Sequence, residues 1–368
     1  MIVRLIGTTE EFLTLRDEWN ALLESSASAC VFLTHEWLSS WWKHLSEGRR
    51  LSILSAHDGA KMIGIMPLAI RAPQYARMMP RVAEFIGSGA IGSDYLDAII
   101  ERGREHDVLP AFAEELRRWD LMLQFTQLRD ESCVMSGLTQ FLGQDRWTTS
   151  STRTNVCPFI DLTNLTWETY LATLGSSHRY NYNRRLRTLQ KTFDVRLDSI
   201  CLANQAESGL DAVIALHRKR WGSVGASEAF QTPAIIAFHR EFVRLAASRG
   251  WLRLLVLSLN NVPVAALYGL RYRSTFYFYQ SGFDPAYSRY SVGLVMMGLA
   301  IKTAFEEGVS EYDLLHGDEE YKFHWARAQR ELVRLEVHPS HARARIYRCA
   351  VDFNRAARRM ARRVLNNV

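Results

Sequence analysis

The order of predicted helices and strands occurs twice along this 368-residue chain, and this duplication constrains the fold more than any other sequence feature. In each half, helical patterns come first and a β-meander follows; a helix, a strand, a short helix and a final strand then end the half. This order is typical of mixed sheets that are covered by helices. We therefore expect an α/β (α+β) chain of two tandem domains, each a mixed twisted sheet flanked by helices.

Local capping and turn signals place the elements of the first half. Thr8 and Glu11 form a capping box that predicts the start of a helix, and Thr34 predicts the N-cap of a helix over residues 36–45. Asp58-Gly59 lies between two apolar runs and predicts a β-hairpin. The rest of this half is predicted as follows: a strand over 95–100, a helix over 108–119, a strand over 121–128, a short helix, and an extended piece running to 162.

The second half is predicted from the same kinds of signal. Asn260-Asn261 predicts the first turn of its meander, because asparagine tolerates a positive φ. The predicted elements are helices over 167–174, 179–191, 210–221 and 235–249, strands over 252–259, 262–272 and 275–281, a helix over 292–307, a strand over 311–315, a short helix from 319, and a strand over 332–338. The polar stretch Thr148–Thr152 predicts the domain boundary. We therefore divide the chain into domains 1–150 and 151–340 and a C-terminal segment, 341–368.

The basic charge of the chain is concentrated in the C-terminal segment. Because eight Arg and one Asp give residues 341–368 a charge of +7, the net charge of +6 leaves −1 for the first 340 residues. A nucleic-acid surface needs basic charge spread along a face or groove. No nucleic-acid partner is therefore expected.

The apolar runs and the cysteines bear on location and on metal binding. No apolar run reaches the length of a membrane-spanning helix. Five cysteines are scattered without paired or metal-like spacing, which favours reduced thiols in a cytoplasm. The histidines show no metal-ligand spacing either. We expect a cytoplasmic protein without a metal site.

The most informative segment runs from Phe276 to Trp325. It contains Tyr279-Gln280-Ser281-Gly282-Phe283-Asp284 and ends in a Gly-Asp-Glu-x-Tyr-Lys-x-x-Trp piece formed by Gly317, Asp318, Glu319, Tyr321, Lys322 and Trp325. These residues resemble the C-terminal domain of the CelD/BcsL acetyltransferase family, relatives of the FemAB proteins that are built from tandem acyl-CoA N-acyltransferase (GNAT) domains. The resemblance covers roughly residues 167–325, and the duplicated architecture extends it to the whole chain.

This resemblance implies a fold and an activity. It implies tandem GNAT-like domains and transfer of an acyl group, acetyl in the first instance, from acetyl-CoA or another acyl-CoA. The acceptor would be an amine or hydroxyl of a small molecule or saccharide, and no metal would take part. The family also implies an association with exopolysaccharide or cellulose production.

The junction between a strand and a helix at residues 284–293 is a candidate acyl-CoA site. Orphan N–H groups and the helix dipole favour an anion such as a pyrophosphate at a helix N-terminus. The residues assigned to acyl-CoA binding are Ser281, Gly282, Arg289, Ser291 and Gly293. Turn geometry and close packing are an alternative explanation for the two glycines.

The predicted catalytic residues follow the strand over 311–315. Acyl transfer needs a base for the proton of the nucleophile and an acid for the departing thiolate. Asp318 or Glu319 is assigned as the base, Tyr321 as the acid and Lys322 as a stabiliser of negative charge, while Asp313 is expected to face the cleft. Capping of the next helix is an equally good reason for the two acids.

Substrate binding is assigned to residues on both sides of this segment. Arg184 and Arg185 belong to a predicted helix whose basic residues have no acid among them, which suits an acidic acceptor or the CoA phosphates. A solvated helix face explains the cluster as well. Tyr279 and His316 are assigned to the substrate because they belong to the informative segment.

Two alternatives to a CoA-dependent acyltransferase remain open. One is a FemAB-like transferase that uses aminoacyl-tRNA, against which the near-neutral body counts. The other is a non-catalytic scaffold of an envelope polysaccharide synthase. Because the first half shows no counterpart of Tyr321-Lys322, we expect it to be structural or to serve the acceptor side.

The C-terminal segment is predicted to be a basic amphipathic helix. Its apolar stripe consists of Ile346, Ala350, Phe353, Ala357, Met360 and Val364. The arginines crowd the remaining faces. The two interpretations are peripheral contact with the anionic inner membrane and packing onto the second domain.

Overall fold

The computed structural model describes residues 1–71, 81–119, 121–143, 147–222 and 229–339. They form a mixed α/β fold of large twisted sheets flanked by helices, which confirms the predicted fold class. The predicted helix over 341–368 lies outside the described residues.

The N-terminal half has helices after its first strand, then a run of strands, and then further helices separated by β8. Its elements are β1 (Ile2–Ile6), α1 (Thr9–Thr14), α2 (Arg16–Ser25), η1 (Val31–Leu33), α3 (His35–Leu45), β2 (Arg49–Leu51), β3 (Ile53–Asp58), β4 (Lys61–Met66), β5 (Leu68–Arg71), β6 (Val82–Phe85), β7 (Ile99–Ile100), α4 (Glu105–Trp119), β8 (Met122–Arg129), η2 (Val134–Leu138), α5 (Thr139–Gly143) and β9 (Thr148–Asp161).

The C-terminal half contains a meander of β11, β12 and β13, and the helices α8 and α9 separate this meander from β10, which pairs with β11. Its elements are α6 (Trp167–Thr173), α7 (Ser176–Thr192), β10 (Val195–Ile200), α8 (Ala203–Trp221), α9 (Pro233–Ser248), β11 (Leu252–Leu259), β12 (Val262–Tyr272), β13 (Thr275–Phe283), η3 (Pro285–Tyr290), α10 (Val292–Glu306), β14 (Glu311–Asp313), α11 (Glu320–Phe323) and β15 (Ala328–His338).

Local signals account for many of the element ends. Thr8 and Thr34 cap α1 and α3 by accepting hydrogen bonds from backbone N–H groups three residues on. Asn260 and Asn261 both have a positive φ in the turn between β11 and β12, as predicted. Among the helices within the described ranges, none is long and apolar enough to cross a lipid bilayer.

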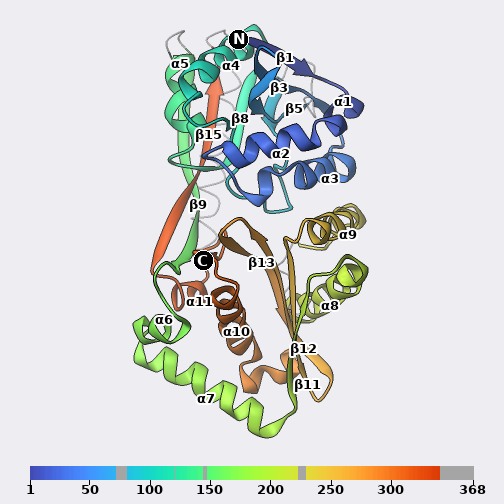
Figure 1. The fold of residues 1–368 in the computed structure, drawn as a ribbon, viewed down its shortest axis with the longest axis vertical. Coiled ribbons are helices and arrows are strands. Elements are labelled where there is room, and N and C mark those ends of the chain that lie inside the picture. The colour runs from blue at the N-terminus through green and yellow to red at the C-terminus, as the bar shows by residue number, and fades with distance from the viewer. Residues whose placement is uncertain (72–80, 120, 144–146, 223–228, 340–368) are drawn as a thin grey trace, which may run out of the picture.

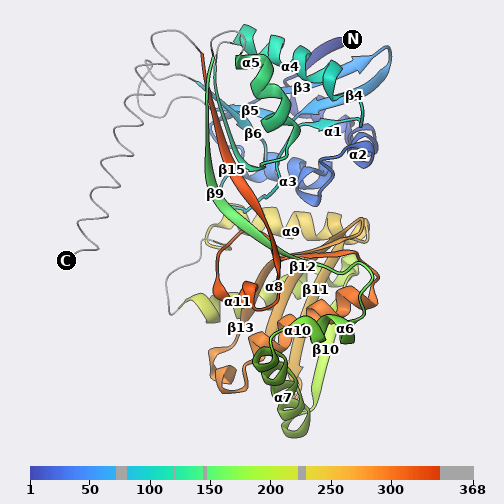
Figure 2. The ribbon, with the colours of Figure 1, turned by 90° about the vertical axis from the view of Figure 1, so that its left-hand side faces the viewer.

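The two halves exchange their last strands. The larger sheet has the order β10-β11-β12-β13-β14-β9-β15-β8-β6-β5-β2, and a second sheet has the order β1-β3-β4-β7. β9 leaves the N-terminal half to pair with β14, while β15 returns from the C-terminal half to pair with β8 (Figures 1 and 2). Between them, β9 and β15 pair antiparallel from Phe159↔Ala328 to Thr148↔His338. The predicted boundary near residue 150 lies within β9, and the division into domains stays a prediction.

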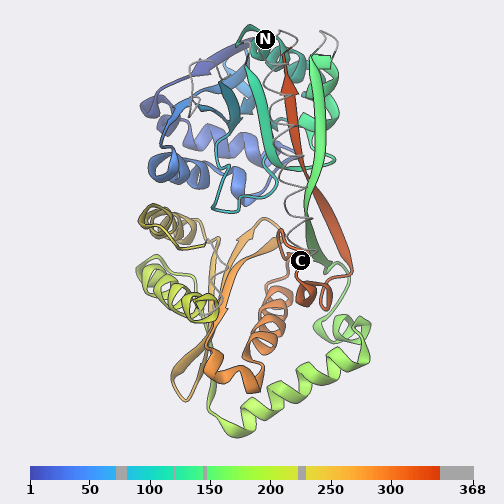
Figure 3. The ribbon, with the colours of Figure 1, turned by 180° about the vertical axis from the view of Figure 1, so that it is seen from behind.

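Helices cover both faces of the meander in the C-terminal half. α8 and α9 lie on one face, and α10 and α7 lie on the other (Figures 1 and 3). β13 and β14 are parallel and pair only over Thr275–Tyr277 and Glu311–Asp313. Because β13 continues to Phe283, the two strands separate beyond these residues, and the sheet opens there.

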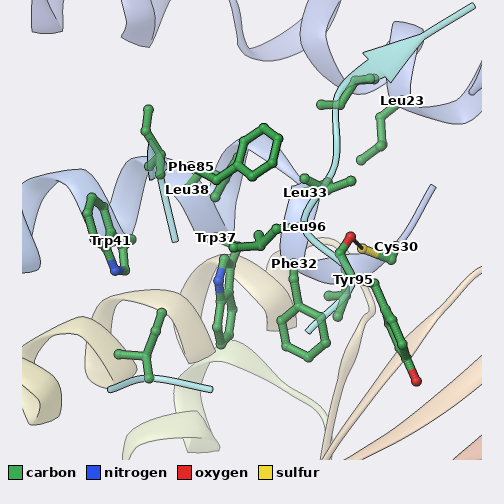
Figure 4. Close-up of a cluster of buried hydrophobic side chains, with 14 of the residues drawn as sticks. Leu23, Cys30, Phe32, Leu33, Trp37, Leu38, Trp41, Phe85, Tyr95 and Leu96 are labelled. Carbon is green, nitrogen blue, oxygen red and sulfur yellow. Dashed lines mark hydrogen bonds between the residues drawn. The ribbon is translucent and has the colours of Figure 1, made fainter. Parts of the chain in front are cut away.

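Aromatic packing joins the two halves. Trp37 of α3 points toward the C-terminal half (Figure 4), where its ring centroid lies 4.9 Å from that of Phe238 and 4.7 Å from that of Phe242. Its indole N–H donates to Ser93 Oγ at 2.9 Å, so the polar edge of the buried ring is satisfied. One apolar core is therefore continuous between the halves, and a second core lies within the C-terminal half.

Candidate active site

An apolar cavity of about 270 Å³ lies where β12 and β13 meet the N-terminus of α10, and we call it the α10 cavity. Its walls include the apolar residues Leu267, Phe278, Val292, Leu294, Met296 and Met297. Four of the five residues assigned to acyl-CoA binding line it: Ser281, Gly282, Ser291 and Gly293. Tyr321 lines it as well.

The N-terminus of α10 is open to an anion. Ser291 precedes the helix in the left-handed conformation, with φ 56°, and its side chain makes no capping hydrogen bond. The first turn carries no acidic residue, so no carboxylate of this turn neutralises the positive end of the helix dipole. The cavity and the helix dipole therefore favour a ligand that has an apolar part and a negative charge.

The two glycines of the cavity have different structural reasons. A Cβ on Gly282 would lie 2.2 Å from the backbone nitrogen of His217, so β13 could not pack against α8. A Cβ on Gly293 would meet only the edge of Phe283, at 3.3 Å. Close packing thus accounts for Gly282, whereas Gly293 leaves room beside the helix N-terminus.

Three arginines assigned to ligands from the sequence, Arg184, Arg185 and Arg289, do not line the α10 cavity. The Arg289 guanidinium lies 4.7 Å from the centroid of the Tyr290 ring, and its carbonyl accepts a hydrogen bond from Arg185 Nη1 at 2.8 Å. Arg184 is exposed on α7 and contacts Asn181 and Tyr180. The structure brings Arg185 next to Arg289 at the surface, and it does not bring Arg184 to Tyr279 or His316.

A second, more polar cavity of about 730 Å³ is formed by residues from both halves, and we call it the central cavity. Its polar and charged wall residues include Arg49, Arg71, Glu84 and Gln127 from the N-terminal half, and Tyr279, His316, Glu319 and Lys322 from the C-terminal half. Arg220, Phe278, Ser281 and Tyr321 line both cavities. These four residues mark the place where an apolar ligand and a polar ligand would meet.

Tyr321 and Arg220 supply a proton donor and a positive charge at this junction. Burial, helped by the carboxylate of Glu319, raises the pKa of Tyr321, so its hydroxyl stays protonated at neutral pH. Arg220 Nη1 donates to Ser281 Oγ at 3.3 Å, and burial lowers the pKa of Arg220. Arg220 could not be identified from the sequence, because it belongs to the run Arg218-Lys219-Arg220, which resembles a solvated helix end.

Lys322 is buried and fully engaged. Its ammonium donates to the carbonyl of His316 at 2.6 Å and to that of Leu315 at 3.3 Å, and it pairs with Glu319 at 3.0 Å. The side chain therefore holds the loop before α11 in shape.

The predicted acids have different environments. Asp318 and Glu319 are exposed, and Glu319 rather than Asp318 is the N-cap residue of α11, without a side-chain capping bond. The alternative of side-chain capping therefore does not account for either acid. Glu319 lines the central cavity, and Asp318 lines neither cavity.

Asp313 is buried beneath the loop instead of facing either cavity. It accepts hydrogen bonds from Tyr95 Oη at 2.7 Å and from the backbone N–H of Leu315 at 2.8 Å, and Arg330 lies 3.3 Å away. Burial raises the pKa of Asp313 to about 6, against the opposing effect of these donors. This carboxyl ties the loop after β14 to the N-terminal half.

His316 meets a carboxylate that the sequence analysis did not single out. Its Nδ1 lies 2.9 Å and 3.0 Å from the two oxygens of Asp94, and its backbone N–H donates to Asp94 at 2.8 Å. Asp94 is fully buried in the N-terminal half. No local signal identifies Asp94, because its partner lies 222 residues away.

Tyr279 is held at the wall of the central cavity. Its hydroxyl donates to the carbonyl of Ile91, and burial raises its pKa. The hydroxyl of Tyr279 is therefore engaged within the protein, although the residue lines the central cavity. Within the described part of the chain, no cluster of three or more His, Cys, Asp or Glu has the arrangement of a metal site.

The sequence of the central part of the C-terminal half matches a known domain family. Residues 176–323 match the model of the acetyltransferase (GNAT) domain. This match includes the N-terminus of α10 and every predicted site residue. No curated protein matches the chain.

Solved structures with little sequence identity share the fold over almost the whole chain. The crystal structure of FemX is 10% identical, with a TM-score of 0.62, over 91% of this chain and 97% of that one. A conserved protein of unknown function from Bacteroides thetaiotaomicron is 13% identical, with a TM-score of 0.56, over 92% of this chain and 100% of that one. The C-terminal domain of a putative lysylphosphatidylglycerol synthetase from Agrobacterium fabrum is 11% identical, with a TM-score of 0.55, over 94% and 97%.

These matches support the general part of the predicted resemblance, whereas membership of the CelD/BcsL family itself stays a prediction. At such identities the likeness of the solved structures concerns the fold alone. The family match, by contrast, covers the residues around the α10 cavity. Residues 176–323 of this chain are thus similar to the acetyltransferase (GNAT) domain.

Proposed function

We propose that this protein transfers an acyl group, acetyl in the first instance, from acyl-CoA to an amine or hydroxyl of a small-molecule or saccharide acceptor. The observation that carries the proposal is the meeting of two unlike cavities at Tyr321, Arg220 and Ser281. The α10 cavity takes the acyl-CoA, with its phosphates toward the helix N-terminus and its thioester at the junction. The central cavity takes the acceptor.

The residues at the junction suit the charges of acyl transfer. When the acceptor attacks the thioester carbonyl, negative charge forms first on the carbonyl oxygen and then on the departing sulfur. Arg220 stabilises the oxygen, since a preorganised positive charge in a partly buried site acts strongly there. Tyr321, whose pKa is raised, donates its proton to the thiolate.

Acyl-CoA binding is tested by isothermal titration with acetyl-CoA and longer acyl-CoAs. Gly293→Asp adds a negative charge at the start of α10, and we expect it to weaken binding at least about tenfold, or ~1.4 kcal/mol. Gly175→Asp is the matched control: Gly175 is the N-cap of α7, and nothing lies within 4 Å of an added Cβ. Equal affinity in both variants would place the acyl-CoA elsewhere.

A FemAB-like transferase that uses aminoacyl-tRNA is the second candidate. The fold likeness to FemX favours it, and the near-neutral body of the chain counts against it. Incubation with a labelled aminoacyl-tRNA separates the two. We expect no transfer of the label, together with binding of acetyl-CoA, and the opposite pair of results would favour this candidate.

The biological setting follows from the family resemblance alone. We propose that the acceptor is a saccharide of exopolysaccharide or cellulose production. Deletion of the gene is expected to lower the acetyl content of the secreted polysaccharide, and an unchanged acetyl content would contradict this setting.

A further inference from the structure

We propose that His316 is the general base of the acyl transfer and that Asp94, from the other half of the molecule, positions it. The inference rests on the proposed function and deepens it, because it names the group that removes the proton of the acceptor. It replaces Asp318 and Glu319, the bases expected from the sequence, with a residue whose geometry suits the task.

The hydrogen bonds of Asp94 fix the orientation of the His316 ring. The buried carboxylate accepts from His316 Nδ1 at 2.9 Å, from the backbone N–H of His316 at 2.8 Å, and from Gln127 Nε2 at 2.7 Å. A carboxylate only accepts hydrogen bonds, so Nδ1 carries the proton and Nε2 of the neutral ring holds a lone pair. Because Gln127 also holds Asp94, the carboxylate itself has little freedom.

The second nitrogen of His316 is available to a ligand. Nε2 has no hydrogen-bond partner among the described residues, and the side chain is 39% exposed. His316 lines the central cavity, which also contains Tyr321 and Arg220. The base, the acid and the cation thus border the same space.

The loop between β14 and α11 keeps these groups together. Lys322 donates to the carbonyl of His316 at 2.6 Å, and Lys322 follows Tyr321 directly in the chain. Lys322 therefore links the backbone of His316 to the segment that carries Tyr321.

The charges around His316 give the base a defined pH range. The carboxylate of Asp94 raises the pKa of His316, burial and the ammonium of Lys322 oppose this shift, and Glu319 adds to it. A base acts in its deprotonated form, so turnover should rise with pH through the raised pKa of His316.

The step balances without any further reactant. His316 Nε2 takes the proton of the acceptor N–H or O–H while the acceptor atom forms a bond to the thioester carbonyl carbon. The carbon–sulfur bond then breaks, and the thiolate of CoA takes the proton of the Tyr321 hydroxyl. His316 passes its proton, through solvent, to restore Tyr321, and the products are the acylated acceptor and CoA.

The catalytic test follows release of CoA from acetyl-CoA, with glucosamine as the probe acceptor because it offers an amine and hydroxyls. We expect His316→Ala and His316→Gln to lower kcat/KM for glucosamine by about 10²–10⁴-fold. Binding of acetyl-CoA should stay unchanged, and added imidazole should restore part of the activity of His316→Ala. His106→Ala, an exposed histidine on α4, is the matched control and should behave as the wild type.

The positioning role of Asp94 has its own readout. Asp94→Asn should lower the rate less than loss of His316 and should move the rising limb of the pH profile to lower pH, because the carboxylate that raises the pKa is gone. Nuclear magnetic resonance titration of His316 should show the same downward shift. A purely structural defect would lower the rate at every pH and leave the limb in place.

The outcomes distinguish a failure of the proposed acyl transfer from a failure of the assignment of His316 as its base. If wild-type protein and His316→Ala release CoA equally fast, the base assignment is wrong and the proposed function stands. If the wild type binds no acetyl-CoA and releases no CoA, the proposed function falls and the base assignment falls with it. If Asp94→Asn leaves the titration of His316 unchanged, Asp94 does not position the base.

Discussion

Both halves of the molecule open a pair of parallel strands, and they use the opening in opposite ways. In the C-terminal half, β13 and β14 pair over three residues each, and the α10 cavity and the central cavity border β13 beyond this pairing. In the N-terminal half, β6 and β8 pair only at Val82–Ala83 and Met122–Leu123. The segment 86–98 then follows β6 and contacts β8, where Leu96 N donates to the carbonyl of Gln127 at 3.2 Å.

The segment 86–98 explains why the N-terminal half still matters to the site. It carries Asp94 and Tyr95, which hydrogen-bond to His316 and Asp313 of the other half. The carbonyl of Ile91, in the same segment, accepts from Tyr279. The opening of the C-terminal half borders the two cavities, while the segment that lies at the opening of the N-terminal half contacts residues that line the central cavity.

The helices that follow the two openings, α4 and α10, differ in the charge of their first turns. The first turn of α4 contains Glu105 and Asp107, whose charges neutralise the positive end of the helix dipole. The first turn of α10 contains no acid. This difference supports the proposal that acyl-CoA binds in the C-terminal half, at the start of α10, whereas the N-terminal half is structural or serves the acceptor side.

The largest effect on activity is expected from Tyr321→Phe, which removes the acid at the junction of the two cavities. Turnover should fall by about 10²–10⁴-fold, because the thiolate would leave without a proton. Acetyl-CoA affinity and thermal stability should change little. Tyr180→Phe, which changes an exposed tyrosine on α7, is the control. Equal turnover in both variants would favour the non-catalytic scaffold.

Lys322→Ala is expected to act first on stability, because the structure gives this side chain a structural role. The variant leaves two carbonyls and Glu319 without their charged donor, and such hydrogen bonds contribute about 1.5–3 kcal/mol each. The free energy of unfolding should fall by about 3 kcal/mol, as measured by urea denaturation. A loss of turnover with unchanged stability would return Lys322 to the catalytic role that the sequence suggested.

The sequence predicted the local parts of the fold well and the long-range parts poorly. The strands over 252–259 and 262–272 have the predicted bounds, since each is rich in apolar residues and Asn260-Asn261 marks the turn between them. β10 was missed because its sequence, Val-Arg-Leu-Asp-Ser-Ile, alternates without a strong apolar run. The exchange of β9 and β15 has no local signal, because strand partners are chosen by tertiary packing.

The residues of the candidate site also differ in whether they could be predicted from the local sequence. Ser281, Gly293 and Tyr321 could be predicted from one segment, because a strand, a loop and a helix N-terminus follow each other there. Asp94 could not, since its role depends on a segment of the other half. Lys322 was predicted to be catalytic from its place in the family-like motif, and Asp313 from its alternation on the strand over 311–315. Only the structure shows the contacts that occupy them.

The burial of the Asp313 carboxyl predicts a pH dependence of stability. Burial raises the pKa of Asp313 from 3.8 to about 6, so the folded state binds a proton more tightly than the unfolded state. Its contribution is therefore fully present below pH 3.8 and is lost as the pH rises to about 6, by on the order of 3 kcal/mol. Asp313→Asn lacks this titration.

Denaturation of both proteins between pH 4 and pH 7 checks this sign. The stability of Asp313→Asn relative to the wild type should increase across the window. A difference in the free energy of unfolding that stays constant between pH 4 and pH 7 would contradict this prediction. It would show that Tyr95 and Arg330 offset the effect of burial on the pKa of Asp313.

The smallest expected effect comes from exchanging the charges of the two helix N-termini. Glu105→Gln removes a charge from the first turn of α4 while keeping an oxygen that can accept from the backbone N–H of Gly103. It should lower the free energy of unfolding by about 0.3–1 kcal/mol, with no change in acetyl-CoA affinity.

Gly293→Asp adds a charge to the first turn of α10, where the dipole favours it, yet the same charge repels the phosphates of CoA. In calorimetry, the loss of the charge in Glu105→Gln should therefore lower stability, and the added charge in Gly293→Asp should raise it. Only Gly293→Asp should weaken the binding of acetyl-CoA. If Glu105→Gln weakens binding as well, the N-terminal half takes part in acyl-CoA recognition and the contrast between the two openings is wrong.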